Sequence, residues 1–89
     1  IITINNNQNT YNRNNSITKE KKESDSYLVN ANKAFDTFII SLADKDAIEA
    51  YTSYIKFLEI TSNNDIYYSN DTIEIIKSRV NKLTKILKL

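Results

Sequence analysis

The 89-residue chain contains no Gly, Pro, Cys, His, Met or Trp. Without Cys no disulfide can form, and without Cys and His the usual ligands of a structural metal are missing. A domain of this size buries only a modest share of its surface, so it needs a cross-link, well-packed helices or a partner. The missing residue types leave helix packing, alone or with a partner, as the way this chain can fold.

The same absences remove most familiar catalytic groups. The chain has no His general base, no Cys thiolate and no Gly-rich phosphate loop. Carboxylates, lysines, tyrosines and hydroxyls remain as possible catalytic groups. When the predicted helices are drawn as helical wheels, however, no acid or lysine lies at the centre of an apolar face, and Glu59 comes closest to one. We therefore expect a protein that is not an enzyme, with no catalytic residue, no cofactor and no metal.

Three segments carry apolar residues at steps of three and four, which is the spacing of amphipathic helices. We expect helices at about 26–43, 47–61 and 72–88, packed up-down-up as a small all-α three-helix bundle. A helical hairpin that associates with itself through the third segment is the alternative. The expected core is Leu28, Ala31, Phe35, Phe38, Leu42, Ile48, Tyr51, Ile55, Leu58, Ile73, Ile76, Val80, Leu83 and Leu87.

Helix boundaries are predicted from capping residues. Asp46 with Glu49, and Asp71 with Glu74, have the spacing of a capping box at the start of the second and third helices. Asn63–Asn64 can supply the left-handed residue that ends a helix in the absence of Gly.

The first 24 residues differ from the rest of the chain. Residues 5–16 hold seven Asn and have no apolar periodicity, so we expect residues 1–24 to be a disordered polar head and residues 25–89 to be the helical domain. Lys19–Glu23 is a mixed charge run, which is typical of the solvated first turns of a helix.

The opening residues resemble a known class of proteins. Ile1-Ile2-Thr3 followed by Ile4-Asn5-Asn6-Asn7-Gln8 is similar to the end of the signal peptides of small secreted phytoplasma effectors. The resemblance implies a short, helical, cysteine-free adaptor that is secreted and binds a host protein. It assigns no role to any residue of the helical body, and the absent initiator Met leaves both a processed and a trimmed N-terminus open.

The predicted helices carry more apolar residues than the contact between two packed helices would bury. On the first helix Val29 and Ile40 fall opposite the apolar stripe, and on the second Tyr54 and Phe57 widen the stripe to about half the circumference. The loop triplet at 66–68 either closes one end of the bundle or forms an exposed recognition loop. The candidate partner-binding residues are Val29, Ile40, Tyr54, Phe57, Ile66, Tyr67 and Tyr68.

The third segment carries an excess of positive charge, and its candidate basic face consists of Lys77, Arg79, Lys82, Lys85 and Lys88. Cations near a helix C-terminus complement the helix dipole, and an anionic partner is the other explanation. A net charge of +1 argues against nucleic acid, and no apolar run approaches the roughly 20 residues that span a bilayer.

The sequence therefore predicts a non-catalytic protein–protein interaction module that binds through a helix face and the Tyr67–Tyr68 loop. An inhibitor or immunity-type protein that blocks a cognate enzyme or toxin is one alternative. A nucleic-acid or membrane-surface binder that uses the basic third helix is the other. The sequence leaves homo-oligomerisation open.

Overall fold

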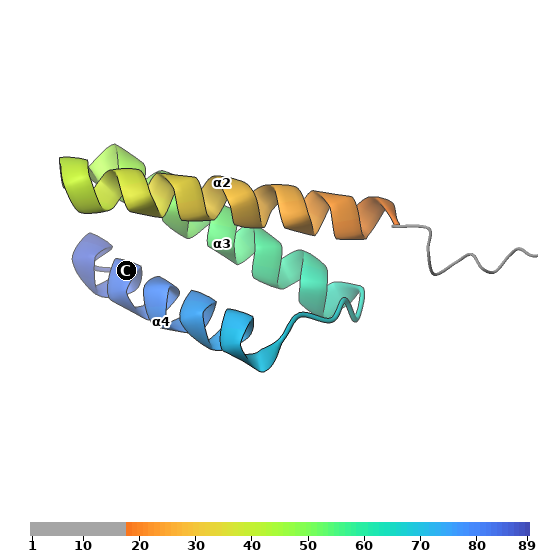
Figure 1. The fold of residues 1–89 in the computed structure, drawn as a ribbon. Coiled ribbons are helices and arrows are strands. Elements are labelled where there is room, and N and C mark those ends of the chain that lie inside the picture. The colour runs from red at the N-terminus through yellow and green to blue at the C-terminus, as the bar shows by residue number, and fades with distance from the viewer. Residues whose placement is uncertain (1–17) are drawn as a thin grey trace, which may run out of the picture.

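A computed structural model describes residues 18–89, which form three helices: α2 (Lys19–Ser41), α3 (Asp44–Asn63) and α4 (Asn70–Leu87). Residues 1–17, which include most of the expected polar head and the signal-peptide resemblance, lie outside the described residues. α2 and α3 run antiparallel, and α4 returns so that the C-terminus lies at the end where α2 turns into α3 (Figure 1). The predicted all-α, up-down-up arrangement is confirmed.

Helix α2 begins earlier than the predicted start at residue 26. Thr18 is its N-cap, and the Thr18 hydroxyl oxygen accepts a hydrogen bond of 3.1 Å from the backbone N–H of Lys21. One turn later Ser24 is completely buried. Residues 19–24, which the sequence analysis assigned to the polar head, are therefore helical because a cap and a buried contact hold them.

The predicted capping boxes are wrong for both later helices. α3 begins at Asp44 without a side-chain cap, and Asp46 instead accepts a hydrogen bond of 2.6 Å from the Ser41 hydroxyl across the turn. α4 is capped by Ser69, whose hydroxyl oxygen accepts a bond of 3.2 Å from the Thr72 N–H. Asp46 and Asp71 lie inside the first turns, where a negative charge favours the helix dipole.

Two residues with left-handed backbone make the turns. Leu42 ends α2 with a φ of 58°, and its side chain is 72% exposed, so it is not the core residue that the sequence predicted. After α3 the left-handed residue is Asp65, with a φ of 52°, rather than Asn63 or Asn64. An aspartate tolerates this conformation because its short polar side chain can hydrogen-bond locally.

The core places a different side of α3 inward than the sequence predicted. Ala47, Ala50, Tyr54 and Phe57 are buried on α3, because small side chains at the first two positions let the neighbouring helix approach closely. The buried apolar residues are Ala31, Phe35, Phe38, Ala47, Ala50, Tyr54, Phe57, Ile76 and Leu83. Of the other expected core residues, Ile48 is exposed, Ile55 is half-buried, and Leu28, Tyr51, Leu58, Ile73, Val80 and Leu87 are half-buried against this core.

The backbone of helix α4 lies close to α3 and stands away from α2. No Cα atom of α2 lies within 8 Å of a Cα atom of α4. Side chains of these two helices line a groove between them.

Candidate partner-binding surfaces

Arg79 is the main link across this groove. Its Nη1 donates hydrogen bonds to the Asn32 side-chain oxygen on α2 (3.1 Å) and to the Tyr54 hydroxyl on α3 (2.9 Å). Its guanidinium carbon lies 4.5 Å from the centre of the Phe35 ring, a cation–π contact. Arg79 is thus part of the packing of all three helices, and its assignment to a free basic face is wrong.

Tyr54 is held from both sides by the same network. It is completely buried, it donates a hydrogen bond to the Asn32 side-chain oxygen, and its ring meets Phe35 edge-on at 6.4 Å between centroids. Burial raises the pKa of Tyr54 above its ordinary value, while the hydrogen bond and charge of Arg79 act in the opposite direction. The negative charge of Asp36 adds a smaller effect that also raises this pKa.

The α2/α4 groove has a volume of about 320 Å³. Ile75, which lines the groove, is 53% exposed. Further along the two helices, Ile39 on α2 is 56% exposed and Ile86 on α4 is 40% exposed. The lining residues are Leu28, Asn32, Thr72, Ile75, Ile76 and Arg79. The sequence does not predict this groove, because the groove depends on how far α4 stands from α2.

Tyr68 ties the α3–α4 connection to the start of α2. Its ring packs edge-on against Phe57, with 4.8 Å between centroids, and the Lys21 ammonium lies 4.4 Å from the centre of the Tyr68 ring. The Tyr68 hydroxyl donates to the Asp25 carboxylate and lies 2.8 Å from the Ser24 hydroxyl. The structure therefore selects the end-closing alternative for Tyr68.

The other two residues of the loop triplet differ in burial. Ile66 is half-buried, and Tyr67 is 82% exposed. Tyr67 thus stays available to a partner, as the recognition-loop alternative requires.

We expect Asp25→Asn to lower the free energy of unfolding by up to about 1 kcal/mol at neutral pH, since the Lys21 and Asp25 side chains are 35% and 45% exposed and solvent screens their pair. Hydrogen bonds from Lys21 and then Tyr68 hold the pKa of Asp25 below its ordinary 3.8. This contribution is complete above pH 3.8 and is lost as the pH falls through the lower folded pKa. Urea unfolding at about pH 7 and about pH 2.5 should show a smaller difference from wild type at the lower pH.

The matched control for this prediction is Glu59→Gln, which neutralises an exposed acid on α3. We expect its free energy of unfolding to stay within about 0.5 kcal/mol of wild type at both pH values. An Asp25→Asn variant as stable as wild type at neutral pH would contradict the assigned role of the Tyr68 contacts.

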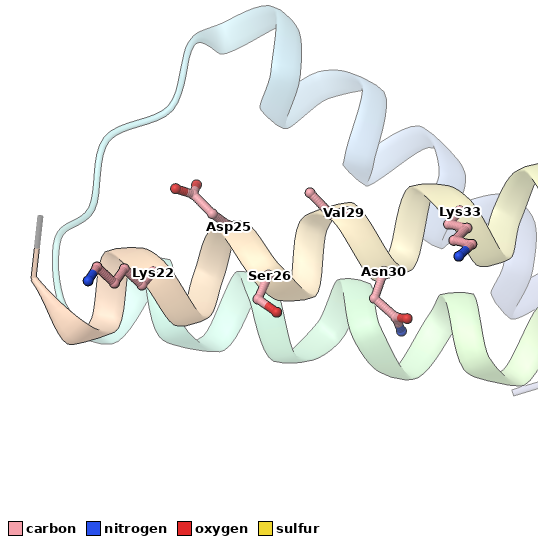
Figure 2. A pocket seen from close by; sticks show the side chains of 6 residues that line it. All are labelled: Lys22, Asp25, Ser26, Val29, Asn30 and Lys33. Carbon is pink, nitrogen blue, oxygen red and sulfur yellow. The ribbon is translucent and has the colours of Figure 1, made fainter.

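The outer α2 face is the helix side that points away from the core. Figure 2 shows six side chains from successive turns of α2 that line a shallow hollow of about 550 Å³: Lys22, Asp25, Ser26, Val29, Asn30 and Lys33. Asn30 turns to α3 and donates to Glu49 (2.6 Å) and Ser53 (2.7 Å), whereas Val29 points away from α3 and is 68% exposed.

Ile40 continues this outer face. It lies three turns beyond Val29 on nearly the same side of the helix and is 86% exposed. Both residues lie on the surface where the sequence analysis placed them. Tyr54 and Phe57, also predicted to contact a partner, are completely buried, and that prediction is corrected.

On α4 the remaining members of the basic face, Lys77, Lys82, Lys85 and Lys88, are exposed. Within residues 18–89 no group of three or more acidic side chains is placed to hold a metal ion. No helix in the described part of the chain is long and apolar enough to cross a membrane. Comparisons with known protein families, curated proteins and solved structures find no match.

Proposed function

We propose that the protein is a non-catalytic protein-binding module that contacts its partner through the outer α2 face, centred on Val29 and Ile40, and through Tyr67. One observation carries the proposal: among the described residues ten large apolar side chains are exposed, against nine buried apolar residues. So much apolar surface in water is typical of a chain that covers part of it with another protein.

The chemistry of the outer α2 face fits a protein surface. Val29 and Ile40 supply apolar contacts, and Lys22, Ser26 and Lys33 supply a polar border around Val29. An apolar centre inside a polar rim is the usual anatomy of a protein–protein contact. If the phytoplasma-effector resemblance of residues 1–8 holds, the partner is a host protein.

The test is affinity capture from host and self lysates with Val29→Gln, Ile40→Gln and Tyr67→Ala beside the wild type. Gln is a good helix former, so the two α2 variants keep the helix while they remove the apolar contact. We expect a protein that is retained by the wild type at high salt and lost with these variants. Lys56→Gln, at an exposed position of α3 outside this face, is the control that should still retain it.

Two results would overturn the proposal. A captured protein that is equally retained by all variants would place binding elsewhere. Recovery of only nucleic acid or lipid, lost at high salt, would favour the alternative function at the exposed lysines of α4, because binding to phosphate groups weakens steeply with salt. In that case Lys77→Glu and Lys85→Glu should remove the binding.

A captured protein would also separate the inhibitor alternative from the adaptor. An inhibitor or immunity-type protein would abolish the activity of the enzyme or toxin that it retains. An adaptor would leave that activity intact.

A further inference from the structure

The groove residues Leu28 and Asn32 on α2, and Ile75 and Arg79 on α4, each begin a strip that continues along the helix beyond the groove. The α2 strip is Leu28, Asn32, Asp36 and Ile39, and the α4 strip is Ile75, Arg79, Lys82 and Ile86, each at steps of three and four along one side of its helix. Both strips read, in the same direction, as an apolar residue, a hydrogen-bonding residue, a charge and an apolar residue. The charge is negative on α2 and positive on α4.

The hydrogen bond between Arg79 and Asn32 fixes the relative height of the two strips. α2 and α4 point the same way along the molecule (Figure 1). With a rise of about 1.5 Å per residue, Asp36 and Lys82 lie about 6 Å and 4.5 Å beyond that bond, and Ile39 and Ile86 both lie about 10.5 Å beyond it. Residues of equal kind, and the two opposite charges, therefore lie level across the groove.

Within one molecule the opposite charges of the two strips do not form an ion pair, and the isoleucines stay exposed. Among residues 18–89 the ion pair is Lys21–Asp25, so Asp36 and Lys82 are more than 4 Å apart, and both are exposed. Ile39, Ile75 and Ile86 likewise remain at least 40% exposed, because α4 stands away from α2.

In a dimer whose twofold axis runs along the groove, both the opposite charges and the isoleucines would contact each other. Such an axis keeps every residue at its height and exchanges the two sides, so the α2 strip of one copy faces the α4 strip of the other in parallel. Asp36 then meets Lys82 of the second copy, and Ile39 meets Ile86 of the second copy, each twice. A twofold axis across the groove would instead place α2 on α2, with like charges on the same wall.

We propose that the α2/α4 groove is the contact surface of a symmetric dimer of this chain, in which Asp36 pairs with Lys82 of the second copy. Asp36 lies one turn before Ile40 and two turns after Val29, so the dimer surface borders the outer α2 face. It goes beyond the proposed function because its occupant is a second copy of this chain.

The test is a charge exchange followed by sedimentation analysis. The wild type is expected to sediment as a dimer once its concentration is raised to about 0.5 mM. Asp36→Lys and Lys82→Glu each place two charges of the same sign opposite each other at both contacts of the dimer. Each variant alone should therefore weaken the dimer by at least about tenfold. Both variants introduce good helix formers, and far-UV circular dichroism should confirm that they stay folded.

The decisive measurement mixes the two variants. A chain with Lys at 36 faces a chain with Glu at 82, and the untouched Asp36 faces the untouched Lys82, so the mixture should form a heterodimer. The chain that carries both substitutions should form a homodimer again. Lys77→Glu, the same charge change on α4 outside the strip, is the control and should leave the dimer intact.

A wild type that stays monomeric overturns the proposal. So does a dimer that Lys77→Glu weakens as much as Lys82→Glu, or two variants that fail to associate when mixed. Failure of the dimer can be told apart from failure of the protein-binding function, because Tyr67→Ala changes a proposed partner-binding residue outside both strips and should leave the dimer unchanged.

Discussion

Replacement of Phe57 by alanine should lower the free energy of unfolding by about 3–5 kcal/mol. Phe57 is completely buried, and its ring is the surface against which Tyr68 packs at 4.8 Å. A single small core without disulfides rarely supplies more than about 3–5 kcal/mol in total. The variant is therefore expected to be mostly unfolded at 25 °C, which urea titration followed by helical circular dichroism would measure.

The control is Tyr67→Ala, which removes an aromatic ring of similar size from a side chain that is 82% exposed. Its free energy of unfolding should stay within about 0.5 kcal/mol of wild type. A cooperative Phe57→Ala transition close to that of the wild type would show that Phe57 is not the centre of the core.

The second large effect is expected for Arg79→Met. Methionine keeps the aliphatic stem but removes the hydrogen bonds to Asn32 and Tyr54 and the cation over the Phe35 ring. We expect a loss of about 2–3 kcal/mol in the free energy of unfolding, because hydrogen bonds from a charged donor and a partly buried cation–π contact are lost together.

The same variant has a spectroscopic signature. Arg79 lowers the pKa of Tyr54 against the effect of burial, so its removal should move the ionisation of Tyr54 to higher pH. Alkaline titration of tyrosine absorbance would detect the change. Lys77→Met, at an exposed position of the same helix, should change neither stability nor titration, and an unshifted Tyr54 in Arg79→Met would contradict the assigned network.

The sequence was sufficient to predict the helical class and the inward sides of α2 and α4. Ala31, Phe35 and Phe38 on α2, and Ile76 and Leu83 on α4, were predicted as core and are buried. Each of these two helices has one continuous apolar stripe at steps of three and four, so spacing alone determines which side faces inward.

Spacing could not settle α3, which has two overlapping stripes. Ile48, Tyr51, Ile55 and Leu58 form one, and Ala47, Ala50, Tyr54, Phe57 and Thr61 form the other at the same steps. The second stripe is buried, because α3 lies between two helices and alanine admits close packing where isoleucine would hold the helices apart. Weighting by hydrophobicity alone favoured the wrong stripe.

The polar contacts had no signal in the sequence. Arg79 with Asn32, and Tyr68 with Asp25, join residues from opposite halves of the chain, and each pair forms only once the helices have their final separation and rotation. The exposed positions of Val29 and Ile40 could be predicted, because the sequence places them opposite a well-defined stripe.

The separation of α2 from α4 also bears on how the chain folds. Packed helix pairs are consecutive in the sequence, and the turn from α2 to α3 takes only Leu42 and Ala43, so little loop-closure entropy is lost in forming the α2–α3 hairpin. Low contact order of this kind is associated with folding in microseconds to milliseconds. The hairpin can form first. When α4 docks, Tyr68 and Arg79 then make their contacts with α2 residues that are far away in the sequence.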